Sequence, residues 1–439
     1  MIQNTGRKAG VLTMFLHLLP VCATLEASHR RGDFMKLVII LLLFLGFAYQ
    51  LALNIVQYRS AANPIPANVA DVYDAETYSK WRRYSAEHCR LHILSTVLSF
   101  AASLVLLCTD AYAAFASLFG GHSYAQLLAV VLLETLVGTV VGVGTSYYGT
   151  MVIEEKYGFN RSTMKTFVKD QIRNLLLGFC LSLLLAWLLA VLHMALGNWM
   201  ILLFAVVVFC FTLVISFLYP IFSRIGNKFV PLEEGALKDS LMNLLTKHGY
   251  QVKAIEVMDA SRRTTKLNAY FTGFGKLKTI VLYDNLVNAM TPEEICAVFA
   301  HELGHGLHKD VLKQQIMNFG NLLLMAVVVW LAVRDPQIHA AFGFDVVNYG
   351  FAYVLAGIGL GLTQPLSSMV MHAYSRYAEF RADRQAVQEG YGPAMVTALK
   401  KLAKENFAHL APSSINVVLE YSHPPLSQRI ARVEAAEKK

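Results

Sequence analysis

Charged side chains are scarce in this sequence of 439 residues. Asp, Glu, Lys and Arg together make up 15% of it, whereas hydrophobic residues make up 55%. Soluble globular domains carry about 25% charged residues, which cover their surface. The scarcity of charge excludes the two or three soluble domains that the length alone would suggest. It indicates a polytopic α-helical membrane protein.

Cysteine is also scarce, and no disulfide framework or cysteine-based metal spacing is present. The six cysteines are scattered, and several fall within apolar runs: Cys22, Cys89, Cys108, Cys180, Cys210 and Cys296. This usage is typical of a protein whose polar parts lie on a reducing side of the membrane. The sequence also lacks internal repeats and low-complexity linkers.

Long apolar runs predict seven membrane spans, each close to the about 20 residues that a bilayer requires. The run at 319–334 is short, so we expect its helix to extend beyond the bilayer. The predicted spans are 37–56, 91–108, 126–148, 174–195, 199–221, 319–334 and 347–371.

Residues 1–34 are harder to interpret. The apolar run from Val11 is interrupted by His17 and Pro20, and it resembles either a signal segment or a weak eighth span. We prefer a third interpretation, because MKLVIILLLFLGF from Met35 has the character of a natural start. On that view 1–34 is an extension without a role in the fold.

The net charge of +8 does not indicate nucleic-acid binding, because the basic residues sort by loop. Segments 57–90 and 149–173 each carry five Lys or Arg residues, whereas 109–125, 196–198 and 335–346 carry none. Alternating basic loops follow the positive-inside rule. They predict that both basic loops, segment 222–318 and the C-terminal region face the cytoplasm, in a bacterial inner membrane or the endoplasmic reticulum.

The expected organisation follows from these runs. Residues 35–221 form an N-terminal membrane region with spans one to five, 222–318 a small α+β module, 319–371 spans six and seven, and 372–439 a C-terminal cytoplasmic region. In the module, the leucine periodicity after Pro231 predicts a helix. YQVKAIEVMD, KLNAYFTGFG and KTIVLYDNL predict three short strands.

The motif HELGH predicts a metal site. His301 and His305 are four residues apart and therefore share a helix face. Two imidazoles on one face can bind one metal ion, with Glu302 beside it as a general base. Thr291 as N-cap, Pro292 as first helical residue and Glu294 as capping-box partner predict where this helix begins.

A catalytic zinc ion normally has three protein ligands and one open position. A histidine six residues after His305 is absent, because position 311 is Val, and His308 is better read as a supporting or structural residue. Glu379, in SRYAEFRADRQAV after the last span, is the better candidate for the third ligand. Asp383, one turn further on, can accept the free ring N–H of a liganding histidine.

With these motifs the chain resembles the CAAX prenyl protease 1 family, which consists of integral-membrane zinc endopeptidases of the gluzincin group. The resemblance rests on five motifs in order: IEEKYGFNRST, KLNAYFTGFG with TIVLYDNL, HELGHGLHKD, EFRAD and SHPPLSQRI. Seven spans is also the number in that family. Arg381 stands where many members have Gln, and residues 1–34 align with nothing.

The resemblance implies roles for further residues. It points to His423, in SHPP, as a donor to the oxyanion of the tetrahedral intermediate, with Arg429 supporting it or contacting substrate. A rigid turn before the C-terminal helix is the alternative for His423. Asn268, Ala269 and Tyr270 are expected to hold an extended peptide by edge pairing, or else to form a plain sheet strand.

Glu134, an ionisable residue inside a predicted span, should face a wet interior or a hydrogen-bonding partner. Such a position fits the intramembrane chamber that the resemblance implies, but a structural hydrogen bond explains it equally well.

The sequence therefore predicts a membrane zinc endopeptidase with one Zn²⁺ per chain. Its expected partners are the bilayer and a peptide or protein substrate, cleaved near the C-terminus of a prenylated CaaX-type or similar membrane-associated protein. A quality-control metalloprotease without a prenyl requirement is the alternative. A transporter is disfavoured because paired half-spans are absent, and an inactive scaffold because Glu302 is intact.

Overall fold

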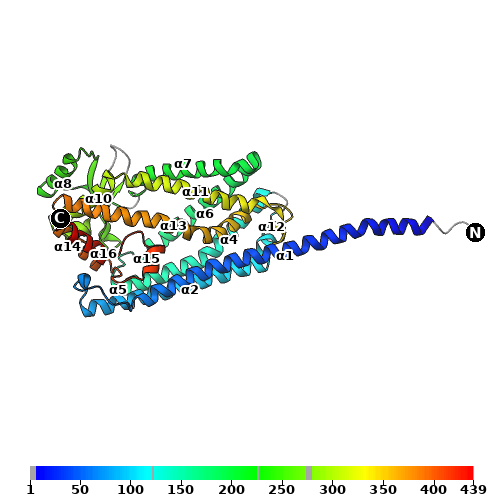
Figure 1. The fold of residues 1–439 in the computed structure, drawn as a ribbon, viewed down its shortest axis with the longest axis horizontal. Helices are drawn as coiled ribbons and strands as arrows, with labels where there is room; N and C mark the ends of the chain where they lie inside the picture. Colours follow the sequence, from blue (N-terminus) through cyan, green and yellow to red (C-terminus); the bar gives the residue numbers. More distant parts are fainter. Residues whose placement is uncertain (1–5, 121–122, 225–226, 273–278, 439) are drawn as a thin grey trace, which may run out of the picture.

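The computed structural model describes residues 6–120, 123–224, 227–272 and 279–438, and it describes side-chain burial in the first helix from residue 31 on. Long helices form a bundle, and a small module of short helices and strands lies at the end of the bundle that holds the C-terminus (Figure 1). Of the residues in the expectation for 1–34, positions 1–5 and the side chains of 6–30 lie outside this description, as does the GFG that ends KLNAYFTGFG.

The seven predicted spans all lie in helices that are long and apolar enough to cross a membrane. One such stretch, Met164–Leu218, contains two helices, which are joined by a 3-10 turn at Gly197–Trp199 where Gly197 has φ +51°. The spanning helices are α1 Gly6–Ser60, α2 Ala75–Cys108, α4 Ser123–Tyr147, α6 Met164–Leu196, α7 Met200–Phe222, α11 Asp310–Arg334 and α13 Tyr349–Gln388.

The helix of the short sixth span does extend beyond the apolar run, as expected. It begins at Asp310, nine residues before the run, because Lys309 adopts the left-handed conformation (φ +56°) and turns the chain between α10 (Pro292–Leu307) and α11. The seventh span is part of the 40-residue α13, which leaves the membrane region and enters the module.

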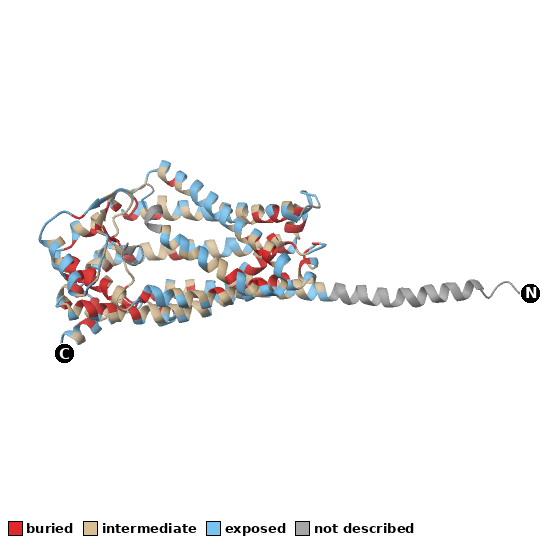
Figure 2. Ribbon diagram, turned by 90° about the horizontal axis from the view of Figure 1, so that it is seen from above, coloured by how far each residue is buried: buried red, intermediate tan, exposed pale blue. Residues whose placement is uncertain are grey.

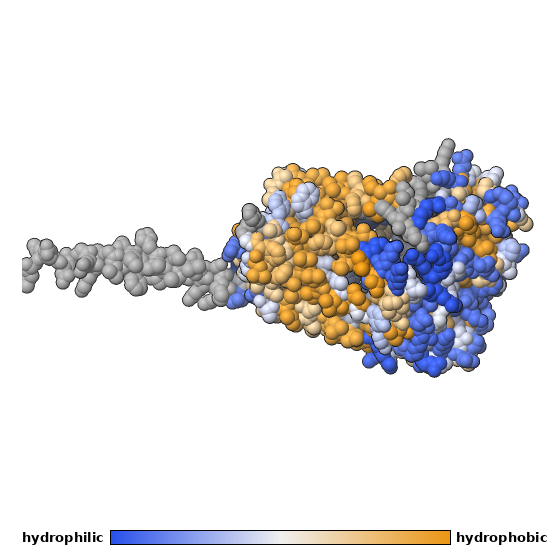
Figure 3. Space-filling view, turned by 180° about the vertical axis from the view of Figure 1, so that it is seen from behind, coloured by the Kyte–Doolittle hydropathy of each residue, from blue (hydrophilic) through white to orange (hydrophobic). Residues whose placement is uncertain are grey.

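The surface of the bundle is apolar, and that of the module is polar (Figure 3). Large hydrophobic side chains stand exposed along the spanning helices, among them Leu37, Val140 and Leu177. An exposed apolar belt of this extent is suited to lipid. Buried residues gather instead toward the two ends of the molecule, with fewer along the helices between them (Figure 2).

The module contains a four-stranded sheet in the order β1-β2-β4-β3. The three predicted strands are present as β2 Ala254–Met258, β3 Ala269–Thr272 and β4 Thr279–Tyr283. The sequence analysis missed β1 Phe229–Pro231, which pairs antiparallel with β2. β2 and β4 are parallel, and β3 pairs antiparallel with β4, so β3 is an edge strand.

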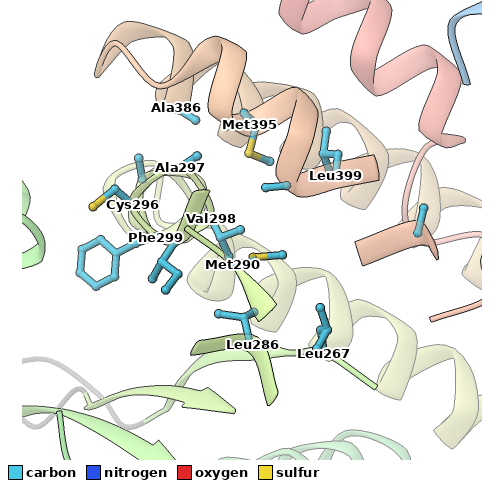
Figure 4. Packing of buried hydrophobic residues seen from close by; sticks show 14 of the residues in the cluster. Leu267, Leu286, Met290, Cys296, Ala297, Val298, Phe299, Ala386, Met395 and Leu399 are labelled. Carbon is cyan, nitrogen blue, oxygen red and sulfur yellow. The ribbon is translucent and has the colours of Figure 1, made fainter. Parts of the chain in front are cut away.

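The module's core forms around α10. Its N-terminus has the predicted capping box between Thr291 and Glu294, with Pro292 at the first position. Ile295, Phe299 and Leu303 of α10 are almost fully buried. Figure 4 shows Ala297 and Val298 facing the chain segments that carry Met290 and Met395, so α10 is enclosed from several sides.

Shorter helices complete the fold. The predicted helix after Pro231 is α8 Ala236–Lys247, with Leu241, Leu244 and Leu245 buried. The others are α3 Ala111–Ser117, α5 Glu155–Tyr157, α9 Asp284–Ala289, α12 Pro336–Ala340, α14 Gly392–Glu405, α15 Ser414–Glu420 and α16 Leu426–Glu437.

Gly304 lets α10 and α13 approach closely. A Cβ atom at this position would lie 3.0 Å from the Ala382 Cα and 3.0 Å from the Gln385 Cβ. We therefore expect Gly304→Ala to push the two helices apart and to destabilise the protein by about 1–3 kcal/mol. Thermal unfolding of the detergent-purified protein checks this. Gly320→Ala on α11 is the control, because nothing lies within 4 Å of its Cβ position. Equal melting temperatures for both variants would contradict the expectation.

Candidate metal and catalytic site

The predicted metal-binding residues meet where α10 packs against α13. His301 and His305 lie on one face of α10, with ring centroids 4.8 Å apart. Glu379 approaches them from α13 and is buried. The Glu379 carboxylate lies 3.5 Å from the His301 Nε2 and 3.3 Å from the His305 Nε2. Two histidines and a glutamate that is at least 74 positions away in sequence therefore offer three donor atoms, all within 4.8 Å of one another.

These separations fit a metal ion. With bonds of about 2.0–2.2 Å, a tetrahedral Zn²⁺ holds its ligand atoms about 3.3–3.5 Å apart. The Oε2 atom of Glu379 is also buried and accepts no hydrogen bond from the described residues. The Arg429 Nη1 lies 3.2 Å from this oxygen and pairs with it by charge, which leaves its hydrogen-bonding capacity unmet. The donor set therefore fits a zinc ion.

Two aspartates fix the histidine rings. The His301 Nδ1–H donates to Asp383 on α13 (2.9 Å), and the His305 Nδ1–H donates to Asp310 at the start of α11 (2.9 Å). Both hydrogen bonds use Nδ1, so each Nε2 is left free to face Glu379. This is the arrangement that orients metal-binding histidines in proteins. Asp383 thus lies where the sequence analysis expected a supporting residue.

Asp310 was missed by the sequence analysis, although it lies in the quoted motif HELGHGLHKD. It is 2% exposed, and its other oxygen accepts from the Tyr374 hydroxyl (2.8 Å) and pairs with Arg381. From the sequence, a carboxylate five residues after His305 predicts this contact only if the helix breaks between the two residues. The left-handed Lys309 makes that break.

Arg429 of α16 lies at the back of the site. Its guanidinium donates to both oxygens of Asp383 (2.6 and 2.9 Å), and its Nη1 lies 3.2 Å from Glu379. Burial lowers the pKa of Arg429, but the charge of Asp383 outweighs this and raises it. The N–H groups of Arg429 are therefore directed at carboxylates of the site.

Four carboxylates and two guanidinium groups occupy this small volume. Glu379, Asp310 and Asp383 pair with Arg381 and Arg429, so that carboxylates outnumber guanidinium groups even before Glu302 is counted. A single divalent cation neutralises that excess. Charge balance is a second, independent reason why these residues fit a zinc ion.

Glu302 is positioned to accept and donate a proton. It follows His301 on α10, and burial raises the pKa of its carboxyl, while the neighbouring His301 and His305 lower it. For His305, burial lowers the pKa, and hydrogen bonds to Glu379 and Asp310 raise it to about 9. That value applies to the site without a cation, which would compete with the proton at Nε2.

His423 reaches the same site from the bend between α15 and α16. Its Nε2 lies 3.3 Å from a Glu379 oxygen, and its side chain is 63% exposed. Ser422 hydrogen-bonds the His423 Nδ1 (2.9 Å), and Arg376 donates to the carbonyls of Val417 and Tyr421 (2.7 Å each). The bend is thus held in place while the imidazole stays accessible.

The edge strand β3 carries the predicted substrate contacts. Asn268 is exposed just before the strand, and its side chain accepts from the Ala269 amide (2.9 Å). Ala269 and Tyr270 pair with Leu282 and Val281 of β4. No strand of the described residues pairs with the other edge of β3.

His308, by contrast, caps α10 by bonding the Gly304 carbonyl (2.8 Å) and does not join the site.

The motif IEEKYGFNRST connects the membrane helices to this strand. α4 continues as a π-helix at Tyr148–Glu154, an irregularity that frequently marks functional sites. Glu154 accepts from Tyr84 (2.7 Å) and lies 3.5 Å from the Lys266 Nζ. Asn160 forms a β-bridge with Thr264. The motif therefore anchors the chain that leads into β3.

Both halves of the chain are similar to known protein families. Residues 54–224 match the family described as "CAAX prenyl protease N-terminal, five membrane helices", and 231–437 match "Peptidase family M48". The chain belongs to the CAAX prenyl protease 1 family. It is a zinc metalloendopeptidase of the membrane, and the predicted fold class is confirmed.

Individual relatives match over nearly their whole length. CAAX prenyl protease 1 of Saccharomyces cerevisiae is 29% identical over 428 residues, which cover 90% of this chain and 94% of the yeast protein. The homologue from Oryza sativa is 28% identical, covering 90% and 96%. The crystal structure of S. mikatae Ste24p superposes with a TM-score of 0.84 at 27% identity, covering 91% of this chain and 99% of that one.

Asp310 provides a test of the ring-orienting hydrogen bonds. Replacing Asp310 by Asn removes the charge that holds the His305 ring, so we expect zinc affinity to fall about 10–100-fold. Competition with a chromogenic chelator measures this affinity directly. Asp345→Asn, in an exposed loop, is the matched control and should leave the affinity unchanged. Unaltered zinc binding by Asp310→Asn would refute this role.

Proposed function

We propose that this chain binds one Zn²⁺ through His301, His305 and Glu379 and hydrolyses a peptide bond near the C-terminus of a prenylated CaaX-type protein. The observation that carries the proposal is the convergence of three donor groups within 4.8 Å of one another, with both histidines oriented by aspartates. Glu302 beside them supplies the group that a hydrolase needs in addition to a metal.

A zinc ion bound there would lower the pKa of a water molecule toward about 7 and polarise the scissile carbonyl. Glu302 takes a proton from that water and delivers it to the leaving amine. Burial favours this role, since it raises the pKa of the Glu302 carboxyl and so makes the carboxylate a stronger proton acceptor.

His423 stabilises the oxyanion of the tetrahedral intermediate. It is the exposed imidazole nearest to the ligand set, and its Nδ1 is already held by Ser422. A preorganised donor that needs no rearrangement is the most effective stabiliser of developing charge. Arg429 supports the site from behind by holding Asp383 and Glu379 and does not reach toward substrate in this arrangement.

The substrate lies along β3 as an additional antiparallel strand. The unpaired edge of β3 offers backbone donors and acceptors, and edge pairing holds a peptide extended with its carbonyls accessible. Asn268, exposed just before the strand, adds a side chain beside this edge. Support for a prenylated substrate comes from the relatives, which are named as CAAX prenyl proteases.

The catalytic side of the membrane is the cytoplasm in this proposal. The basic loops 57–90 and 149–173 lead to the end of the bundle where α10, α14 and α16 lie, whereas α12 lies at the opposite end (Figure 1). The positive-inside rule then orients the whole bundle.

Cleavage of a farnesylated CaaX peptide tests the activity. We expect detergent-purified protein to release the C-terminal tripeptide, detected by mass spectrometry, and Glu302→Ala to lose at least about 10²-fold in rate, because the general base is gone. The mutant should retain zinc, since both histidines remain.

The unprenylated twin of this peptide separates the two enzyme classes. Cleavage of both peptides at equal rates would indicate a protease without a prenyl requirement, such as a quality-control enzyme. If zinc-loaded protein cleaves neither peptide, the proposed substrate class is wrong, although the hydrolytic site is unaffected by that result.

The orientation is tested by a green fluorescent protein fused after Lys439. In a bacterial expression host that reporter fluoresces only when it stays on the cytoplasmic side, so we expect a fluorescent fusion with unchanged zinc binding. An alkaline phosphatase fused at the same point should be inactive. Active phosphatase and a dark fluorescent protein would reverse the proposed topology.

A further inference from the structure

A side chain from α14 pairs with the backbone just before β3. Asn406, at the C-terminal end of that helix, accepts from the Leu267 N–H through its Oδ1 (2.9 Å) and donates to the Leu267 carbonyl through its Nδ2 (3.1 Å). A side-chain amide that bonds both backbone groups of one residue imitates a neighbouring strand. The mechanism described above does not use Asn406.

The direction of the backbone groups shows which edge of the strand Asn406 occupies. The Asn268 carbonyl accepts from the Tyr283 N–H of β4 (3.1 Å), so the backbone of Asn268 faces β4. Along an extended strand, successive residues direct their backbone groups alternately to the two edges. Leu267 and Ala269 therefore direct theirs to the outer edge, with which no strand of the described residues pairs. Asn406 lies on the same edge as the proposed peptide.

The two outward positions differ in how firmly they are occupied. Asn406 makes two hydrogen bonds to Leu267, which is 5% exposed. The Ala269 N–H donates to a single acceptor, the side chain of the exposed Asn268 (2.9 Å). A peptide carbonyl can replace that acceptor at little cost, because the Asn268 side chain can rotate into water and bond there. Displacing Asn406 would break two bonds at a buried residue. Pairing with a peptide can thus begin at Ala269 but not at Leu267.

The end of α14 that presents Asn406 is fixed by parts of the fold other than β3. The next residue, Phe407, adopts the left-handed conformation (φ +52°) and turns the chain out of the helix. Its carbonyl accepts from the Trp81 Nε1–H of α2 (3.1 Å), and its ring packs edge-on against Phe159 of the motif IEEKYGFNRST (centroids 5.0 Å apart). The Asn406 amide is therefore held from outside the sheet, at a point that does not move with β3.

We propose that Asn406 is a positioning residue for the peptide substrate. Its side-chain amide closes the outer edge at Leu267, fixes the segment that enters β3, and so determines where the backbone of a paired peptide begins. Asn406 acts on the substrate through Leu267 and Ala269. The inference rests on the proposed function, because it assumes that the peptide pairs with this edge.

Two metal-binding inhibitors of different length test this role without requiring hydrolysis. Acetohydroxamate binds a metal ion and is too small to pair with a strand, whereas a hydroxamate of the farnesylated CaaX peptide can do both. Isothermal titration calorimetry with zinc-loaded, full-length protein in detergent measures both affinities. We expect Asn406→Ala to weaken the peptide hydroxamate at least about tenfold and acetohydroxamate less than about twofold, because the two lost hydrogen bonds position only the strand. Equal losses for both inhibitors, or no loss for the peptide, would overturn the proposal.

Asn406→Asp keeps the experiment decisive if Asn406→Ala folds poorly. Aspartate has the same shape and still accepts from the Leu267 N–H, but it cannot donate to the Leu267 carbonyl. We expect this variant to retain its zinc affinity and melting temperature and to bind the peptide hydroxamate more weakly than the unmutated protein. Unchanged peptide affinity in Asn406→Asp would refute the role. Glu405→Ala, at the exposed preceding residue of α14, is the control and should change neither affinity.

These measurements also separate this inference from the proposed function. If the unmutated protein cleaves no prenylated peptide, while binding of the peptide hydroxamate still depends on Asn406, the proposed activity fails and the positioning role stands. Cleavage of the prenylated peptide by the unmutated protein, together with equal peptide affinities in Asn406→Ala and the unmutated protein, would do the reverse.

Discussion

The close packing of α10 against α13 is the contact on which the rest of the site depends. Gly304, one residue before His305, has no side chain, and this allows the α13 backbone at Ala382 to approach. At that distance one turn of α10 presents two imidazoles, and one turn of α13 presents Glu379 and Asp383. Sites built on packed helices are more rigid than sites on loops, and metal ligands need positions fixed to a few tenths of an ångström.

The charged residues around this contact form two hydrogen-bonded series. His301 is held by Asp383, which is held by Arg429, and His305 is held by Asp310, which pairs with Arg381. Each series runs from a histidine of the candidate metal site to a guanidinium group on another part of the fold. Buried charges are tolerated only when they are paired and hydrogen-bonded. Each arginine therefore supplies a counter-charge to its aspartate in a largely buried site, and each aspartate accepts a hydrogen bond from the Nδ1–H of its histidine.

Sequence alone was sufficient for whatever depends on local spacing. The helix of HELGH, its capping box, the shared face of Glu379 and Asp383 and the seven spans all follow from periods of 3.6 residues and from runs of about 20. Asp310 could not be assigned this way, because its position depends on a single left-handed residue, Lys309, which breaks the helix. The contact between Arg429 and Asp383 joins residues 46 positions apart, and no helical or strand period predicts it. β1 was missed because three residues are too few to show an alternating pattern.

The long α13 explains why a peptidase of this kind is built into a bilayer. Its 40 residues run from the far end of the bundle into the module, so that one rigid element carries both part of the lining of a cavity in the membrane bundle and the Glu379 carboxylate. A substrate anchored in lipid near its scissile bond presents two chemically different parts within a few bonds of each other. The peptide part must reach a hydrolytic centre in water, whereas a hydrocarbon anchor is stable only in an apolar environment. A continuous helix that crosses from one environment to the other fixes the distance between Glu379 and the membrane bundle. A soluble domain tethered by a flexible linker would leave that distance undefined.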